Sequence, residues 1–229
     1  MKTKSQLADK FSGPSSLLYQ SDLLNIEDSY KAVSSTTGKN PKNEGWYEKG
    51  TGDVYTKTED TTPGQSKTYY TAVKSISVTP ELDLPCKVDT LNFEQGDAET
   101  EEYKIIGQAG AWVTESEPGE IELGFRIPSI SADVLKLAFG EDAVSDITGS
   151  VDSVDYEGLA LILKNKKVQG TWMIINSTKD RIMILNNTTL FASLKLDSDA
   201  KGVMAVDFKG SLESDGTNPD VIFLKKKTS

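Results

Sequence analysis

The chain has 229 residues, 37% of them hydrophobic, and a formal net charge of −10. This length is typical of one large β domain or of one domain with a small appendage, and the acidic balance predicts repulsion from nucleic acids and anionic membrane surfaces. Histidine is missing from the sequence, which excludes the usual general base, the Ser-His and Cys-His dyads and most zinc sites.

Sequence motifs of enzymes and cofactor sites are missing as well. The chain contains no Walker A, GxGxxG or GxSxG pattern and no EF-hand loop. Its one cysteine, Cys86, cannot form an internal disulfide and is typical of a small buried side chain. Residues 1–30 are too polar for a signal peptide, and no apolar run approaches the roughly 20 residues of a membrane span. We therefore expect a soluble protein that is not an enzyme, with no catalytic residue, no cofactor, no metal and no membrane contact.

The first part of the chain predicts little regular structure beyond one strand region. Residues 1–14 are polar and end in Gly-Pro, which favours a mobile arm or a short docking element. Residues 15–26, SSLLYQSDLLNI, predict a strand or a strand pair. Residues 27–44 are rich in Ser, Thr, Asn and Lys and predict a loop.

Aromatic residues gather in the next segment, GWYEKGTGDVYTKTEDTTPGQSKTYYTAV. Alternation around two Gly-containing turns predicts a three-stranded meander with strands at 46–49, 54–58 and 68–73. We expect Trp46, Tyr55 and Tyr69 to form its small core. The predicted division of the chain is an inserted module at residues 38–74 within a main domain made of residues 1–37 and 75–229.

The function of this module is open between three interpretations. Tyrosine offers a flat apolar face with a polar tip, which suits base stacking, carbohydrate or partner contact, or a self-contained structural decoration. Lysines and carboxylates nearly balance in the segment, which disfavours nucleic acid. The candidate residues for outer-surface contact are Trp46, Tyr47, Tyr55, Tyr69 and Tyr70.

The stretch after the module is acidic and strongly patterned. We expect strands around SISV and VDTLNF, and then a hairpin over residues 111–127 that turns at EPGE. Nine carboxylates between residues 94 and 122 are opposed only by Lys104; they are Glu94, Asp97, Glu99, Glu101, Glu102, Glu115, Glu117, Glu120 and Glu122. These residues are compatible with divalent-cation binding, with a functional negative surface, or with an ordinary solvated strand face.

One helix is predicted, over residues 131–139. Ser131 can cap its N-terminus, Asp133 complements the dipole in the first turn, and Gly140 can end the helix in a left-handed conformation. The apolar residues recur on one side, as expected for a helix that lies on a sheet.

The remainder of the chain predicts mostly strands. Residues 142–158 form a polar connection whose middle pairs weakly, and residues 159–165 and 168–177 form a hairpin around a Lys-Lys turn. Three more strands are expected, at 181–196, 203–214 and 220–227. The predicted fold class is therefore mainly β, a β-sandwich or barrel with one flanking helix and a small inserted β meander.

In the order of its elements the chain resembles the major tail (tail-tube) proteins of long-tailed bacteriophages. The resemblance rests on the acidic segment that ends near KIIG, on WVTESEPGEIELGFRIPS, on the helix SADVLKLAFG, and on the closing strands in MAVDFKGSLESDGTNPDVIFLKK. It covers residues 14–35 and 75–229 and depends on order and pattern, not on an invariant motif. The tyrosine-rich segment is similar to a short module of phage structural and surface proteins, except that Gln65-Ser66 replaces a glycine.

This resemblance implies a tail-tube fold and a structural subunit of a virion tail. Six copies would form a ring, and stacked rings would form the tube through which DNA is ejected. The implied partners are other copies of the chain and other tail proteins (the terminator, the tape measure or a sheath), while DNA passes without specific binding. The nine carboxylates would then face the lumen or the contacts between rings, and the tyrosine-rich module would lie outside. The alternative is a capsid-decorating or tail-tip protein that binds host surface polysaccharide.

Overall fold

The structure is a computed structural model, and its two compact units are described separately. Residues Met1–Leu23 and Thr79–Ser229 form unit 1, and residues Leu24–Val78 form unit 2. The described residues are 11, 13–34, 46–57, 68–87, 89–103, 106, 109, 113–117, 119–197, 203–214 and 216–227.

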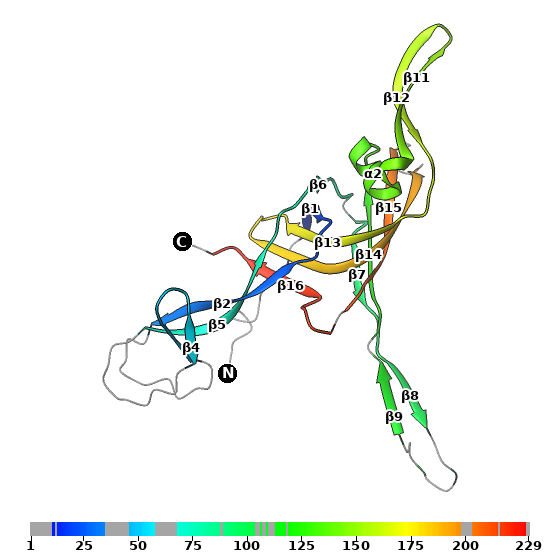
Figure 1. The fold of residues 1–229 in the computed structure, drawn as a ribbon. Coiled ribbons are helices and arrows are strands. Elements are labelled where there is room, and N and C mark those ends of the chain that lie inside the picture. The colour runs from blue at the N-terminus through cyan, green and yellow to red at the C-terminus, as the bar shows by residue number, and fades with distance from the viewer. Residues whose placement is uncertain are drawn as a thin grey trace, which may run out of the picture. The chain divides into compact units, whose positions relative to one another are not determined.

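Unit 1 is built on one eight-stranded sheet that curls into half a barrel (Figure 1). The strand order is β6-β1-β13-β14-β15-β10-β7, and β16 also pairs with β14. The strands are β1 (Pro14–Gln20), β6 (Leu82–Leu84), β7 (Asn92–Gln95), β10 (Ile121–Ile127), β13 (Lys167–Asn176), β14 (Arg181–Asp197), β15 (Val203–Leu212) and β16 (Val221–Lys225). The predicted fold class, mainly β with one helix, is confirmed.

The long strand β14 organises this sheet. One of its edges pairs with β13, while the other pairs with β16 over residues 181–185 and with β15 over residues 188–197. The strand predicted at 181–196 is therefore correct, and so are the strands expected next to it at 203–214 and 220–227. Because β14 is seventeen residues long, it continues past the end of each neighbour and carries the curvature of the sheet.

The inner face of the half-barrel is packed around Trp172, whose side chain is fully buried. Its ring centroid lies 4.7 Å from those of both Tyr19 and Phe125. Period-two alternation brings every second residue of each strand to this face. The buried residues of the strands include Leu17, Leu123, Phe125, Ile127, Ile174, Leu185, Leu190, Val206 and Phe208.

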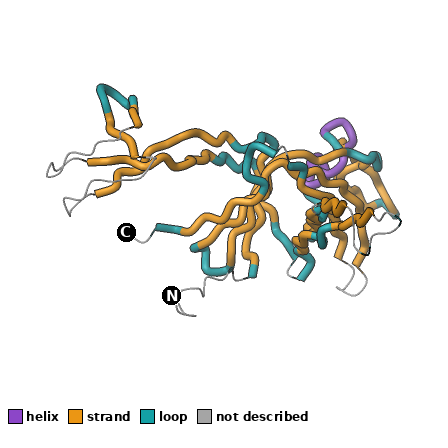
Figure 2. The backbone as a smooth tube through the Cα atoms, turned by 90° about the horizontal axis from the view of Figure 1, so that it is seen from below, coloured by secondary structure: helices purple, strands orange, loops and turns teal. Residues whose placement is uncertain are grey.

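The α-helix of unit 1, α2 (Ala132–Phe139), packs its apolar side into the same core (Figures 1 and 2). Its position confirms the predicted helix, but the predicted cap is wrong: the Ser131 side chain makes no capping bond, and only its carbonyl accepts the first helical hydrogen bond, from Leu135. Gly140 has a φ of 110° and leads into a short 3-10 turn, Glu141–Ala143. A residue with a Cβ would be strained at this φ.

Two further pairs of strands form two-stranded ribbons outside the main sheet. One ribbon joins β8 (Glu99–Tyr103) to β9 (Val113–Glu117), and the other joins β11 (Val144–Val151) to β12 (Val154–Leu161). The second ribbon replaces the weakly pairing connection expected at 142–158. Asp152 and Ser153, at φ values of 50° and 62°, make its two-residue turn, which matches the twist of the strands.

Two predicted hairpins are wrong. β9 does not pair with β10; β9 pairs with β8, and β10 pairs with β7 and β15. β12 does not pair with β13 either, since β12 pairs with β11 and β13 with β1 and β14. Alternation predicts strands in both places, but strands that are neighbours in sequence are not neighbours in this sheet.

Unit 2 is a four-stranded sheet with the order β2-β5-β3-β4. Its strands are β2 (Asn25–Ser34), β5 (Thr68–Ser77), β3 (Trp46–Lys49) and β4 (Tyr55–Lys57). The loop predicted from residue 27 is wrong over 27–34, which belong to β2. Because β2 pairs along its full length with β5, the compact unit spans 24–78, whereas the sequence placed the module at 38–74.

Candidate functional site

The predicted carboxylates all lie on one continuous ribbon of unit 1. Gln95 lies opposite Ile121, Gly96 N–H donates to the carbonyl of Glu120 at 2.8 Å, and Glu99 lies opposite Glu117. These pairs share one register, so β7 and β8 run antiparallel to β10 and β9 as one continuous pair of segments. We call the segments 92–103, 113–117 and 119–124 the acidic ribbon.

Register places the carboxylates of the acidic ribbon directly opposite one another. Glu94 pairs with Glu122 and Glu101 with Glu115, and all four side chains are exposed. The Cα register also sets residue 99 against residue 117. Like charges directly opposite in an antiparallel pair are destabilising. This arrangement therefore costs stability, although exposure to water lessens the repulsion.

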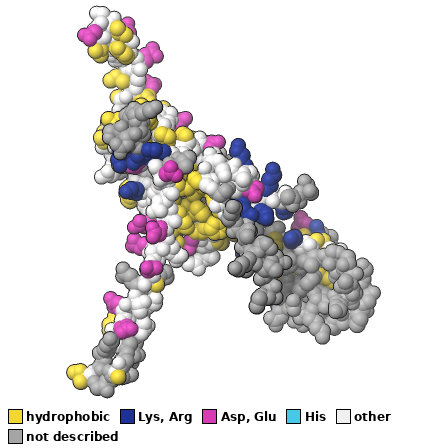
Figure 3. Space-filling model, turned by 180° about the vertical axis from the view of Figure 1, so that it is seen from behind, with side chains coloured by type: hydrophobic (Ala, Val, Ile, Leu, Met, Phe, Trp, Pro, Cys, Tyr) yellow, Lys and Arg dark blue, Asp and Glu magenta, His cyan; other side chains and the backbone are white. Residues whose placement is uncertain are grey.

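The remaining predicted carboxylates lie on the same ribbon. Asp97, Glu102 and Glu120 are exposed, and the Tyr103 hydroxyl donates to Glu101 at 2.9 Å. Acidic side chains are visible along this part of unit 1 in Figure 3. The structure thus brings together in space what the sequence showed only as a dense acidic stretch.

A close approach of two glycines divides the acidic ribbon into its two halves. A Cβ at Gly119 would lie only 2.1 Å from the carbonyl oxygen of Gly96, a distance that no side chain tolerates. Glu117 and Glu120 both pair with the segment 92–103, so the turn predicted at EPGE is wrong. Gly119 lets the two backbones cross closely where the ribbon leaves the main sheet.

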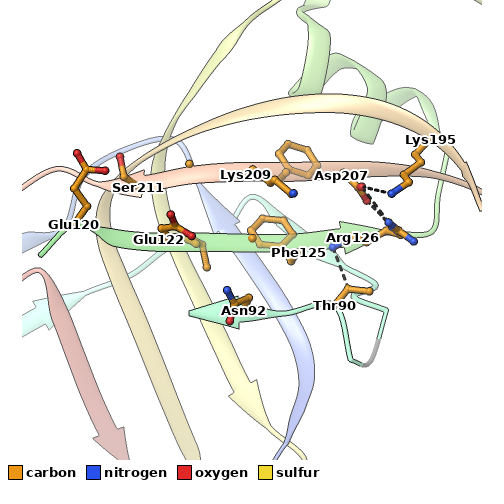
Figure 4. Close-up of a pocket in the computed structure, with 14 residues that line it drawn as sticks. Thr90, Asn92, Glu120, Glu122, Phe125, Arg126, Lys195, Asp207, Lys209 and Ser211 are labelled. Atoms are coloured by element: carbon orange, nitrogen blue, oxygen red, sulfur yellow. Dashed lines mark hydrogen bonds and ion pairs between the residues drawn. The ribbon is translucent and has the colours of Figure 1, made fainter. Parts of the chain in front are cut away.

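A groove of about 730 Å³ lies on the sheet where the acidic ribbon begins (Figure 4). Glu120 and Glu122 line one end of it, and Arg126 and Asp207 line the other. Arg126 Nε donates to Asp207 Oδ1 at 2.5 Å, and Lys195 Nζ lies 3.7 Å from Asp207 Oδ2. The charges at that end of the groove are thus engaged with one another.

The tyrosine-rich face of unit 2 forms a compact cluster. The rings of Tyr30 and Tyr55 stack at 4.0 Å with 13° between their planes, and Tyr47 and Tyr70 meet them edge-on at 4.9 and 5.1 Å. We call these four residues the tyrosine cluster; each is half-buried. Three of them are predicted contact residues; Tyr30 is not, because the polar composition of residues 27–44 predicts a loop there.

The other two predicted contact residues do not join this cluster. Tyr69 points to the opposite face and is only 2% exposed, so it is a core residue of unit 2 and not a contact residue. The expectation that Tyr69 shares a core with Tyr55 is therefore wrong. Trp46 lies in β3, and its side chain is outside the described residues.

An exposed ion pair stands beside the tyrosine cluster. Lys49 Nζ lies 2.8 Å from Asp53 Oδ1 and 5.8 Å from the centre of the Tyr55 ring. A hydrogen bond to Asp53 raises the pKa of Lys49, and the same bond lowers the pKa of Asp53. Cation–π contact and pairing hold this side of the cluster in place.

The described residues contain no group of three or more His, Cys, Asp or Glu side chains placed to hold a metal ion. Nor does any helix in the described part of the chain have the length and apolar character needed to cross a membrane.

Comparison of the chain with protein-family models, curated proteins and solved structures finds no match.

Proposed function

We propose that this chain is a structural subunit of a bacteriophage tail tube, which assembles as stacked hexameric rings and forms the conduit for DNA ejection. The acidic ribbon is the observation that carries the proposal. Glu94 lies opposite Glu122 and Glu101 lies opposite Glu115, and each of these pairs lowers stability. We therefore expect the concentrated negative surface to have a function that offsets this cost. A conduit for a polyanion gains from such a surface, because repulsion keeps DNA from binding to the wall.

The open architecture of unit 1 supports assembly. The main sheet is half a barrel, and in its described part β6 and β7 each pair on one edge only. Strand edges present unpaired amides and carbonyls, which a neighbouring subunit can satisfy. An isolated two-stranded ribbon is at best marginally stable in water, so both ribbons of unit 1 also favour a partner. Repetition of one such contact around an axis closes a ring.

The proposal places the protein in the virion tail. Its partners are other copies of the chain and other tail proteins, such as the terminator, the tape measure or a sheath. DNA passes without specific binding, and the work of the subunit is assembly, not catalysis.

Electron microscopy of the purified protein tests the proposal directly. We expect six-membered rings or tubes at high protein concentration. A protein that stays monomeric under all conditions would overturn the assembly function.

The role of the acidic ribbon has its own test. Tubes of the E101K/E115K variant should retain DNA in a low-salt gel-shift assay, whereas wild-type tubes should not. The matched control is E27K/D28K, which makes the same charge change on exposed residues of unit 2. Equal retention by the two variants would show that net charge matters and that the ribbon does not line the conduit.

A second candidate function is polysaccharide binding by a capsid-decorating or tail-tip protein. The tyrosine cluster favours it, because four half-buried tyrosines with Lys49 beside them offer aromatic and polar contacts on one face. Glycan-array binding that is lost in Y47A and kept in E101K/E115K would support it. The mutual stacking of the rings is equally explained by a self-contained structural role.

A further inference from the structure

The β11–β12 ribbon has one face that carries no charge and whose large side chains are exposed. Cross-strand register places Ile147, Gly149 and Val151 on this face, opposite Gly158, Tyr156 and Val154. The large side chains are strongly exposed: Ile147 54%, Val151 63%, Val154 52% and Tyr156 55%. Only the base of the ribbon packs on the core, through Val144 and Leu161. We call residues 144–161 the arm; yellow side chains gather at its end in Figure 3.

The opposite face of the arm is acidic. The same register sets Asp146, Glu157 and Asp155 on that face, all of them exposed. A partner stabilises such an arm if it covers the apolar face and brings cations to the acidic face.

Strand β16 has an open edge, an exposed aromatic side chain and nearby cations, which complement the two faces of the arm. Among the described residues it pairs only with β14, so its other edge is open, and its Phe223 is 67% exposed. Cations surround the end of this strand; they are Lys179, Arg181, Lys225, Lys226 and Lys227, and Asp180 is the carboxylate among them. The chain has a net charge of −10, so most of its surface repels an acidic arm. The cationic end of β16 attracts it instead.

The arm points away from β16 of its own chain (Figure 1). It leaves unit 1 beside α2, where Lys166 Nζ contacts the carbonyl of Leu137 and Lys167 pairs with Phe191. β16 pairs with residues 181–185, six to ten residues further along β14, or roughly 20–34 Å at the rise of a strand. The arm points away from the sheet, whereas β16 lies toward the opposite end (Figure 1).

We infer that the arm of one copy adds to the open β16 edge of a second copy. The contact pairs backbone groups along the edge and lays the apolar face of the arm beside Phe223. Asp155 and Glu157, on the other face of the arm, then come close to the lysines at the end of β16. The contact joins two different surfaces, so each subunit gives an arm and receives one, and it repeats around a ring or along a tube. This inference rests on the proposed function and names the surfaces through which the copies associate.

A charge exchange tests this contact. D155K/E157K reverses the charge of the acidic face of the arm, and K225E/K226E reverses the charge at the end of β16. Both variants change exposed side chains only. Each variant alone should weaken self-association at least about tenfold in sedimentation velocity, because like charges then meet. A mixture of the two variants should associate as the wild type does, and so should one chain with all four changes.

The matched controls are E27K/D28K and K31E/K57E, which make the same charge changes on unit 2 and should associate as the wild type does. If wild-type tubes form and the reversed variants assemble equally well, the proposed function stands and the arm contact is wrong. If only the arm variant fails and the mixture is not rescued, the arm binds another surface, which also overturns the inference. If the wild type never associates, both proposals fail.

Discussion

Arg126 and Asp207 form an ion pair. We expect that replacement of Asp207 lowers the free energy of unfolding more than replacement of Arg126 does. Two hydrogen bonds join them, at 2.5 Å from Nε to Oδ1 and at 3.1 Å from Nη2 to Oδ2. Their side chains are 15% and 13% exposed, so both charges lie largely out of water. Lys195 makes the two partners unequal. Its half-exposed ammonium lies 3.7 Å from Asp207, so Asp207 has a second cation beside it.

Asp207→Ala leaves a mostly buried guanidinium and the Lys195 ammonium near each other without the carboxylate between them. Removal of one partner of a buried pair costs about 3–5 kcal/mol, and we expect this variant at the upper end of that range. Arg126→Met leaves Asp207 with Lys195 beside it, and solvent can reach that lysine. We expect a smaller cost, about 2–3 kcal/mol.

Urea unfolding at pH 7, followed by far-UV circular dichroism, measures both free energies of unfolding. The double variant R126M/D207L removes both charges and should lie within about 1 kcal/mol of the wild type, because apolar replacement of a buried pair is often neutral. The reasoning fails if Arg126→Met is the more damaging change, or if both single variants cost under about 1 kcal/mol.

Three further predictions concern single residues of unit 1. Burial, with a smaller effect of Glu81, raises the pKa of Tyr19 to about 12, so between pH 10 and 12 the unfolded chain loses a proton that the folded chain keeps. The free energy of unfolding should therefore fall by about 2 kcal/mol across that window, and urea titrations of Tyr19→Phe should lack this component. Burial also raises the pKa of the Cys86 thiol, so iodoacetamide at pH 8 should label it more slowly in the folded protein than in urea, as mass spectrometry can measure; equal rates would contradict this. A Cβ at Gly210 would lie 1.9 Å from the carbonyl oxygen of Thr189, so Gly210→Ala should cost about 3 kcal/mol or more in urea unfolding, whereas Gly149→Ala, with open space around it, should cost about 0.5 kcal/mol or less. Similar costs for the two alanine variants would show that β14 and β15 can separate at Gly210.

Local pattern was sufficient for several elements of this fold. Apolar periodicity predicted α2, and alternation predicted β14, β15 and β16 at nearly their observed bounds. The exposed carboxylates of the acidic ribbon were also predictable as a group, since charged side chains in a strand region stay in water. Each of these features depends on residues that are close in sequence.

Pairing partners could not be predicted in the same way. Alternation in residues 111–127 shows which residues share a face, but it does not show that β9 lies against β8 while β10 lies against β15. Tyr30 was missed for a related reason, because it meets Tyr55 and Tyr47 across strands that are distant in sequence. The sequence predicts only weak pairing in the arm because Ser, Asp and Gly stand between its apolar residues, and its two-residue turn depends on the backbone angles at Asp152 and Ser153.

The sequence by itself therefore determined the mainly β class, the helix, and the concentration of negative charge between residues 94 and 122. The tertiary structure alone decided that those charges face one another in pairs, that four tyrosines from separate segments stack, and that the arm and β16 lie at distant parts of one unit. The physical reason is that side-chain periodicity depends on local backbone geometry, whereas strand register and partner choice depend on which faces can be buried together.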